Sequence, residues 1–216
     1  MKKLILPVFV ITFCPVLIFG QNNFEFGVKA GGNLSNIKSD NPFKKSWADS
    51  KFGFNVGGIT NYNFTEDIAL HSGVELTKKG FKYNYDNWFI DNIGYKDIDC
   101  VANLTYIQIP VSFAYKIYFN FFKLVPEIGM YLSYGIKGNY KYNPDNINGE
   151  KTYIVFHKND EYYFNKYTKR QDIGINAAAG VEFNRCVLKF GYEYGFTNIQ
   201  RNSNISLSVG YIFLTK

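Results

Sequence analysis

The stretch LTYIQIPVSFAYKIYFN, residues 104–120, alternates between two kinds of side chain. One set is large and apolar: Ile107, Ile109, Val111, Phe113 and Tyr115. The intervening set is smaller or more polar: Tyr106, Gln108, Pro110, Ser112 and Ala114. A repeat of two is that of a β-strand, because successive side chains point to opposite faces of a sheet. The stretch predicts one long strand, and the fold of the chain depends on which of its faces is the inside.

The same alternation recurs along most of the chain, at residues 24–31, 52–62, 68–77, 124–134, 172–183, 188–195 and 205–213. Together with the stretch above this gives eight strands of roughly ten residues, the length that a tilted strand needs to cross a bilayer. Short turns alternate with longer polar segments, the longest at residues 84–101 and 138–170. Such alternation is typical of outer-membrane barrels. We therefore expect an all-β fold, an eight-stranded antiparallel up-and-down transmembrane β-barrel.

The composition favours a β protein over a helical one. Aromatic residues make up 19% of the 216 residues, and there are 19 glycines. Aromatic side chains favour strands, and glycine weakens helices. The formal net charge is +6, but the basic residues lie mostly in predicted loops and alternate with Asp and Glu. A nucleic-acid partner, which requires a basic cluster on one element, is not expected.

Residues 1–20 have the pattern of a cleaved secretory signal peptide. Lys2 and Lys3 form a positive start, an apolar run covers residues 4–19, and Gly20 is a small residue before Gln21. The run is shorter than the about 20 apolar residues of a membrane-spanning helix. We expect export through this signal, and a barrel domain formed by residues 21–216.

Two kinds of eight-stranded barrel fit the alternation. In a soluble, lipocalin-like barrel the apolar face fills the interior, and in a membrane barrel it meets lipid. Three features favour the membrane barrel: glycines on the polar face, connections whose lengths alternate by end, and aromatic residues near both ends of the apolar face. Two aromatic belts of this kind mark the two bilayer interfaces.

The polar face is then expected to point into the lumen. Side chains fill the interior of an eight-stranded barrel, so we predict a buried ion-pair network instead of a channel. The residues assigned to this network are Glu25, Lys29, His71, Glu75, Gln108, Glu127, Glu182, Lys189 and Glu193. Pro110 has no backbone donor, and we expect a bulge or a missing hydrogen bond beside it.

The long loops are rich in tyrosine and tryptophan among polar residues, a composition that makes adaptable binding surfaces. The candidate binding surface is Trp47, Trp88, Tyr140, Tyr153, Tyr162 and Tyr163. The same side chains would also serve to brace the loops against each other and against lipopolysaccharide, and the sequence does not separate these two roles.

No metal-ligand spacing and no phosphate-binding glycine loop is present. His157 lies near Asp160 and Glu161 in the longest predicted loop, where no rigid element positions a catalytic group. We therefore predict no catalytic residue, metal or cofactor. Cys100 falls at the loop end of its strand and Cys186 at the turn end of another. The two ends of a membrane barrel are roughly 25 Å apart, far beyond the reach of a disulfide. We therefore predict two free thiols.

Five segments, taken in order, resemble the PorT-like outer-membrane β-barrel proteins of Bacteroidota. They are GVKAGGNLSNI (27–37), YIQIPV (106–111), AAGVEF (178–183), EYGFTNI (193–199) and SLSVGYIF (206–213). The resemblance implies an eight-stranded barrel in the bacterial outer membrane with both termini in the periplasm. It does not imply one activity. The chain departs from many such proteins at its end, because residues 214–216 follow the last aromatic residue, Phe213.

Three functions are compatible with this reading. The one we favour is a non-enzymatic, monomeric outer-membrane barrel, in contact with outer-membrane lipid and lipopolysaccharide, whose outer loops bind a partner or support envelope integrity. The second is an accessory subunit of a secretion or assembly complex, with another envelope protein as its partner. The third is a barrel enzyme that modifies lipid or peptide.

Overall fold

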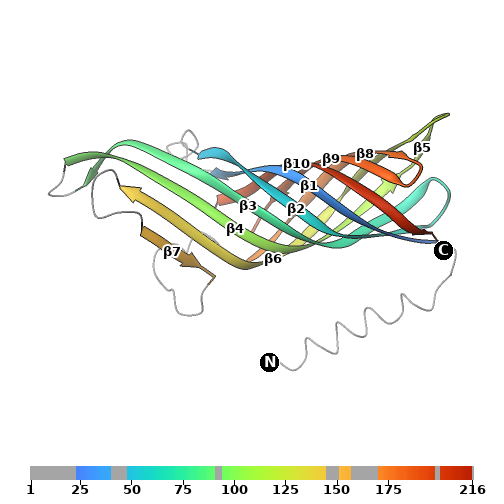
Figure 1. The fold of residues 1–216 in the computed structure, drawn as a ribbon, viewed down its shortest axis with the longest axis horizontal. Helices are drawn as coiled ribbons and strands as arrows, with labels where there is room; N and C mark the ends of the chain where they lie inside the picture. The colour runs from blue at the N-terminus through green and yellow to red at the C-terminus, as the bar shows by residue number, and fades with distance from the viewer. Residues whose placement is uncertain are drawn as a thin grey trace, which may run out of the picture.

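The computed structural model describes residues 23–39, 48–90, 94–144, 151–156, 170–197 and 200–215. Eight long strands form a barrel (Figure 1). They are β1 Phe24–Ser39, β2 Ala48–Asn63, β3 Ile68–Ile90, β4 Gly94–Tyr115, β6 Lys123–Pro144, β8 Gln171–Phe183, β9 Cys186–Gly195 and β10 Gln200–Thr215. Two short strands, β5 Ile117–Tyr118 and β7 Lys151–Val155, pair with β6.

The strand order closes on itself. Each long strand pairs antiparallel with the next long strand in the chain, and β10 returns to pair with β1. The fold is therefore the eight-stranded antiparallel up-and-down barrel that the alternation predicts, and closure leaves these ladders without a free edge. Within the described ranges, no helix is long and apolar enough to cross a membrane.

The apolar face of the strands points outward, as the membrane reading requires. On β4, Phe113 is 63% exposed while Gln108 is fully buried. Phe52 on β2 and Ile128 on β6 are likewise exposed, at 71% and 69%. A protein in water does not leave large apolar side chains exposed along every strand while it buries its charges. The lipocalin-like alternative is thereby excluded.

Pro110 interrupts one ladder without distorting it. The β3–β4 pairing runs from Ser72 opposite Val111 to Glu75 opposite Gln108 in unchanged register, and the two intervening positions are unpaired. The backbone nitrogen and carbonyl of a strand residue face the same neighbour, so the missing donor of Pro110 lies on this side. The Ser72 hydroxyl donates to the Pro110 carbonyl at 2.9 Å. The outcome is a missing hydrogen bond and not a bulge.

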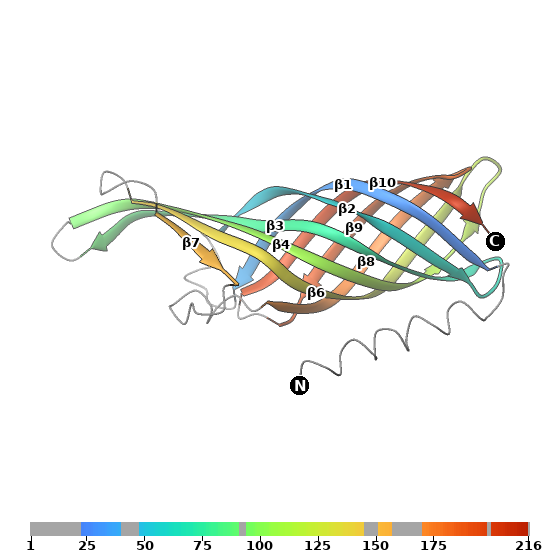
Figure 2. The same ribbon diagram turned by 60° about the horizontal axis from the view of Figure 1, so that its bottom comes forward.

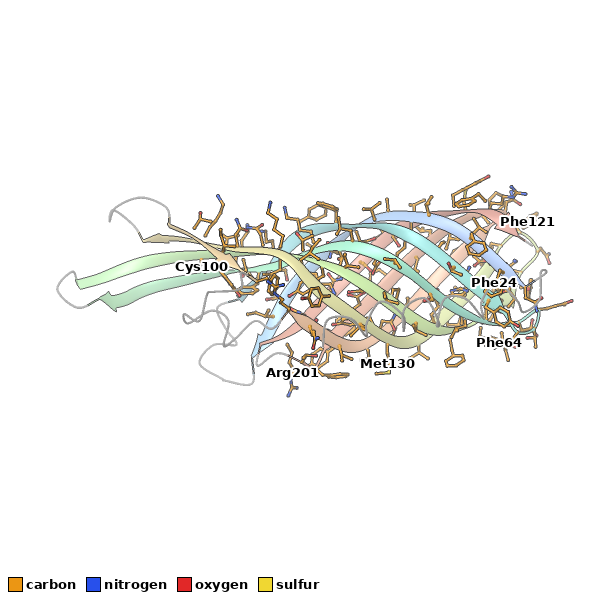
Figure 3. All side chains as sticks on the ribbon, turned by 90° about the horizontal axis from the view of Figure 1, so that it is seen from below. Phe24, Phe64, Cys100, Phe121, Met130 and Arg201 are labelled. Atoms are coloured by element: carbon orange, nitrogen blue, oxygen red, sulfur yellow. The ribbon has the colours of Figure 1, made fainter. Side chains whose placement is uncertain are left out.

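The two ends of the barrel differ. One end, which we call the turn end, holds the short connections β2–β3, β4–β6 and β8–β9; Figure 3 shows Phe24, Phe64 and Phe121 gathered there. At the other end β3, β4 and β6 run 23, 22 and 22 residues and project past the remaining strands (Figures 1 and 2). We call this projecting sheet, with β7 on its edge, the extension.

The extension corrects the prediction of polar loops. Residues 84–101, predicted as a loop, belong mainly to the β3–β4 hairpin, in which β3 ends at Ile90 and β4 begins at Gly94. The predicted loop 138–170 begins as strand, because β6 continues to Pro144 and β7 pairs with it. Segments rich in Asn, Asp and Lys disfavour strand formation only weakly, and pairing with neighbouring strands overrides that preference.

The inner side of the extension has an apolar core of its own. Its buried members are Ile37, Phe81, Cys100, Ala102, Leu104, Tyr106, Tyr140 and Phe156. The two thiols lie where the sequence predicts: Cys100 is buried in this core, Cys186 is exposed at the turn end, and both are free.

Candidate functional site

The middle of the lumen is crossed by a compact polar cluster. Lys79 on β3 donates to Gln108 Oε1 on β4 and to Glu193 Oε2 on β9, both at 2.8 Å. The Gln108 amide nitrogen in turn donates to Glu75 Oε1 at 2.8 Å and to Glu193 Oε1 at 2.6 Å. Lys29 forms an ion pair with Glu75 at 2.5 Å. These bonds connect opposite walls of the barrel, so the cluster closes the lumen.

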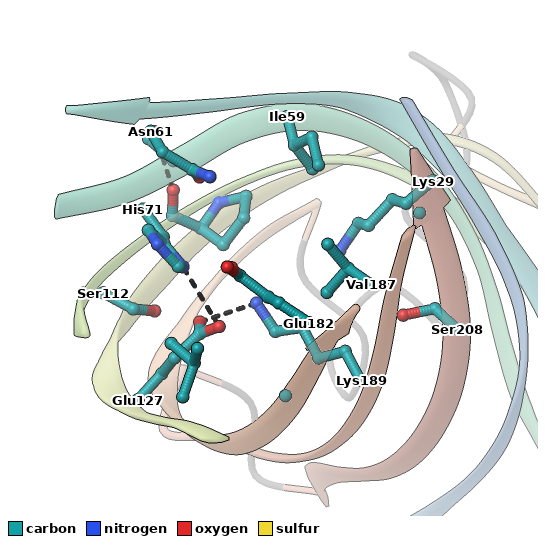
Figure 4. Close-up of a pocket in the computed structure, with 15 residues that line it drawn as sticks. Lys29, Ile59, Asn61, His71, Ser112, Glu127, Glu182, Val187, Lys189 and Ser208 are labelled. Carbon is teal, nitrogen blue, oxygen red and sulfur yellow. Dashed lines mark hydrogen bonds and ion pairs between the residues drawn. The ribbon is translucent and has the colours of Figure 1, made fainter. Parts of the chain in front are cut away.

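A second cluster lies nearer the turn end, around a small cavity (Figure 4). Glu127 on β6 accepts from Lys189 on β9 at 2.6 Å and lies 3.1 Å from His71 Nδ1 on β3. Glu182 lies 3.7 Å from Lys123. The cavity has a volume of about 40 Å³. A space of that size accommodates water molecules and not an organic substrate.

Two further inward carboxylates lie near the two ends of the lumen. At the turn end, Glu25 accepts from Asn61 and Asn63 at 3.0 Å each and lies 3.5 Å from Lys116. At the extension end, Asp172 accepts from Tyr131 at 3.1 Å and from Asn202 at 2.7 Å. Buried charge is costly unless it is paired and hydrogen-bonded. Glu25 has both kinds of partner, whereas Asp172 has hydrogen bonds to Oδ2 alone and its Oδ1 atom has no hydrogen-bond partner.

Every residue assigned to the lumen from sequence lies on the inner face, in one of these clusters. Sequence reasoning missed Lys79 because it ended that strand at Thr77, and it missed Lys116 although this residue lies within the predicted strand 104–120. The signal was present: Lys79 is two positions beyond Thr77, and Lys116 is two beyond Ala114, so both continue the inward face. Asp172, the first residue of the predicted strand 172–183, is a further buried carboxylate that the predicted network does not include.

The second cluster has the residue types of a hydrolase triad, and its geometry argues against that use. Ser112 lies directly opposite His71 in the β3–β4 ladder, and His71 contacts Glu127. However, His71 Nε2 has no hydrogen-bond partner, and the Ser112 hydroxyl accepts instead from Asn176 at 2.9 Å. A nucleophile requires a bond to its base and space for a substrate, and neither condition is met.

Metal binding finds no support in the described part of the chain. Among those residues, no group of three His, Cys, Asp or Glu side chains is placed to hold a metal ion. Nothing in the lumen geometry assigns a cofactor to the inward carboxylates, whose partners are lysine, amide, histidine and tyrosine side chains of the barrel itself.

The predicted loop surface is only partly described. Tyr140 is wrongly assigned to it: the side chain is buried in the core of the extension, with its ring 5.8 Å from that of Phe81. The reason is that β6 continues past residue 138, which turns Tyr140 inward. The backbones of Trp88 and Tyr153 lie in β3 and β7. Trp47, Tyr162 and Tyr163 lie outside the described residues.

The polarity of the strands inverts at the base of the extension. On each of β3, β4 and β6, the outward face changes from apolar to polar residues. On β3, Val74 and Leu76 are followed by Lys78 and Lys82. On β4, Ile107 is followed toward the extension by Thr105 and Asn103, and on β6, Ile136 is followed by Lys137 and Lys141. The inward face changes in the opposite sense, from the polar lumen to the apolar core of the extension. The change marks the edge of the lipid-facing belt.

Residues 19–201 match the family model described as outer membrane protein beta-barrel domain. No curated protein sequence matches the chain. Among solved structures, Ail, the attachment invasion locus protein of Yersinia pestis, is 18% identical over 88% of this chain and 99% of Ail, with a TM-score of 0.42. Neisserial surface protein A is 17% identical over 87% and 97% of the two chains, with a TM-score of 0.40. The outer membrane protease OmpT from Escherichia coli is 8% identical over 89% and 97%, with a TM-score of 0.38.

Proposed function

Because this chain belongs to the family of outer membrane protein β-barrel domains, we propose that it is a non-enzymatic, monomeric barrel of the bacterial outer membrane. In this proposal the ion-paired lumen is a structural plug. The extension lies outside the bilayer and binds a partner at the cell surface.

The observation that carries the proposal is the closed lumen. Lys79, Gln108 and Glu193 join β3, β4 and β9 across the interior, and these hydrogen-bonded side chains obstruct the passage of a solute. We expect purified protein inserted in a planar bilayer to give no single-channel conductance. Heat-dependent gel mobility of the same preparation reports that the barrel is folded. Well-resolved conductance steps from a folded preparation would contradict the proposal.

The absence of enzymatic activity is tested on lipid and lipopolysaccharide. The small cavity, and a His71 Nε2 atom without a hydrogen-bonded nucleophile, predict that the folded protein releases no fatty acid from either. A release that His71→Gln abolishes, with folding retained, would favour the barrel enzyme instead.

The extension supports partner binding because it is a paired sheet with its own core, held clear of the barrel (Figure 2). A photo-reactive amino acid at Ile154 on β7, which is 62% exposed, should cross-link to a protein on intact cells. The matched position is Ile128, which is exposed on the lipid-facing belt and should give lipid adducts only. Equal protein adducts at both positions would count against a binding role for the extension.

A secretion or assembly subunit is the second candidate, favoured by the segments that resemble PorT-like proteins, such as residues 27–37 of β1. The same cross-linking distinguishes it, because the adduct at Ile154 would then contain a component of the secretion machinery. Export through a cleaved signal is part of either proposal. The N-terminus of the protein isolated from outer membranes should lie near Gln21, and a mature chain that retains Lys2 and Lys3 would contradict cleavage.

A further inference from the structure

Lys51 takes an unusual course across the outer face of the extension. It lies where the β2–β3 register shifts, between Ser50 and Asn55, so β2 bulges at this point. Its side chain passes over Gly80 of β3, and its Cδ atom lies 3.0 Å from where a Cβ on that glycine would be. The ammonium group then donates to the Ala102 carbonyl at 3.1 Å and to the Asn103 side chain on β4. The absence of a side chain at Gly80 is what allows this crossing.

Other lysines surround this ammonium group on the same face. Lys82 and Lys141 both pair with Val101, which places them on either side of β4 in one row. Lys78 and Lys137 both pair with Thr105 and form a second row. The rows lie four residues apart on β4, with Asn103 midway, so each is about 7 Å along the strand from the Lys51 ammonium. Lys51 therefore occupies the middle of a frame of lysines.

The electrostatics agree with this geometry. Burial and the charges of Lys78, Lys82 and Lys141 lower the pKa of Lys51 to about 8. Among the side chains that the structure describes, Asp49, opposite Lys82, is the carboxylate on this face. Like charges held this close destabilise one another unless an anion lies between them.

The frame lies directly above the lipid-facing belt. Lys78 Nζ is 6.0 Å from the centre of the exposed Phe54 ring, and Ile107 and Ile136 are the next outward residues toward the barrel. Lysines at this level coincide with the headgroups of the surrounding lipid, and their stems can lie along apolar surface. A lipid beside the belt would thus bring its phosphate groups to these ammonium groups.

We propose that Lys51, Lys78 and Lys82 form a binding site for the phosphate groups of an outer-leaflet lipid, with lipopolysaccharide as the expected ligand. This inference rests on the proposed outer-membrane location. Ammonium–phosphate contacts supply the charge recognition, and the exposed Phe52 and Phe54 rings beside the frame contact the acyl chains. The occupant is a lipid and not a free ion, because the frame adjoins the apolar belt.

The test uses the full-length folded protein in detergent, titrated with lipopolysaccharide and with the same material after removal of its phosphates. We expect the intact lipid to bind at least tenfold more tightly, and binding to weaken as salt is raised. The combined variant Lys51→Gln/Lys78→Gln/Lys82→Gln should lose at least tenfold in affinity. Arg185→Gln, which removes an exposed cation at the turn end, should bind as the unaltered protein does.

Three results would overturn the proposal. They are equal binding of the dephosphorylated lipid, unchanged affinity of the combined variant, and displacement of the lipid by millimolar inorganic phosphate, which would identify a free ion as the ligand. Heat-dependent gel mobility of each variant shows that the barrel is folded. Failure of lipid binding with mobility and lack of conductance unchanged would remove this site and leave the proposed function standing.

Discussion

Three strands, β3, β4 and β6, run through both the barrel and the extension, and their polarity is opposite in the two regions. In the barrel, β3, β4 and β6 turn Glu75, Gln108 and Glu127 inward and apolar side chains outward. In the extension, they turn Phe81 and Leu104 inward and lysines outward. The difference teaches that the medium outside the sheet sets the pattern: lipid requires an apolar exterior, and water with charged headgroups requires a polar one.

The two regions are also stabilised differently. The lumen depends on ion pairs whose members are desolvated, so that the loss of one partner leaves a buried charge unpaired. The extension depends on burial of apolar surface, as the core of a soluble protein does. The predictions below separate these two cases, beginning with the largest expected effect.

Lys79→Met should destabilise the barrel by about 3–5 kcal/mol, because it leaves Glu193 and Gln108 without their cation in the middle of the lumen. Urea unfolding in lipid vesicles, followed by gel mobility, measures the loss. The matched variant is Lys78→Met, one position along β3 on the outward face, which should change stability by less than about 1 kcal/mol. Equal losses would mean that the lumen pairs contribute nothing specific.

Val111→Lys should cost about 2–4 kcal/mol, because Val111 faces lipid within the belt. Thr105→Glu places a charge on the same face of β4 but beyond the inversion of polarity, between Lys78 and Lys137, and should cost little. The same unfolding assay compares them. If the two substitutions cost the same, the edge of the bilayer does not lie between these positions.

Leu104→Ala should loosen the extension by about 2–3 kcal/mol and leave the barrel intact, because Leu104 is buried in the core of the extension. Cys100 reports the opening: burial raises the pKa of its thiol to about 11, and it should react with a maleimide slowly. The variant should raise that labelling rate roughly 30-fold or more. Cys186, exposed at the turn end, should label quickly in both proteins and controls for reagent reactivity, while loss of heat-dependent gel mobility would indicate unfolding of the whole barrel.

The smallest effect concerns the charge of Lys51. Its pKa of about 8 lies below the ordinary 10.5, so the folded protein binds fewer protons than the unfolded chain between these values. Stability of this region should therefore rise as pH increases from about 8 to 10.5 and be unaffected below pH 8. Lys82→Gln removes one repelling charge and should raise the pKa, measured by the pH dependence of acylation at Lys51. A lower pKa in that variant would contradict the lysine frame.

The segments with strict alternation could be assigned from sequence. The alternation in residues 104–120 predicts a strand that forms part of β4, and it predicts the face of that strand that meets lipid. It also predicts the missing hydrogen bond at Pro110. Each of these features depends on local chemistry. The polar network could be assigned in the same way wherever the inward positions were followed along the whole alternation, and they were not followed to Lys79 and Lys116.

The extension could not be assigned in that way. Residues 84–101 lack the apolar outward face that a bilayer imposes, so nothing local distinguishes a paired strand from a loop. Tyr140 illustrates the consequence. The polar composition of the segment around it suggests an exposed surface, but pairing between β4 and β6 buries its side chain.

The sequence by itself determined the barrel, its strand number and the face that meets lipid. The reason is that side chains alternate with a period of two along each strand, and the side that meets lipid must be apolar. Only the tertiary structure decided which charges meet in the lumen, how far β3, β4 and β6 run past the bilayer, and that Lys51 reaches across Gly80 to Asn103. These contacts join residues far apart in the chain, and only the register between strands brings them together.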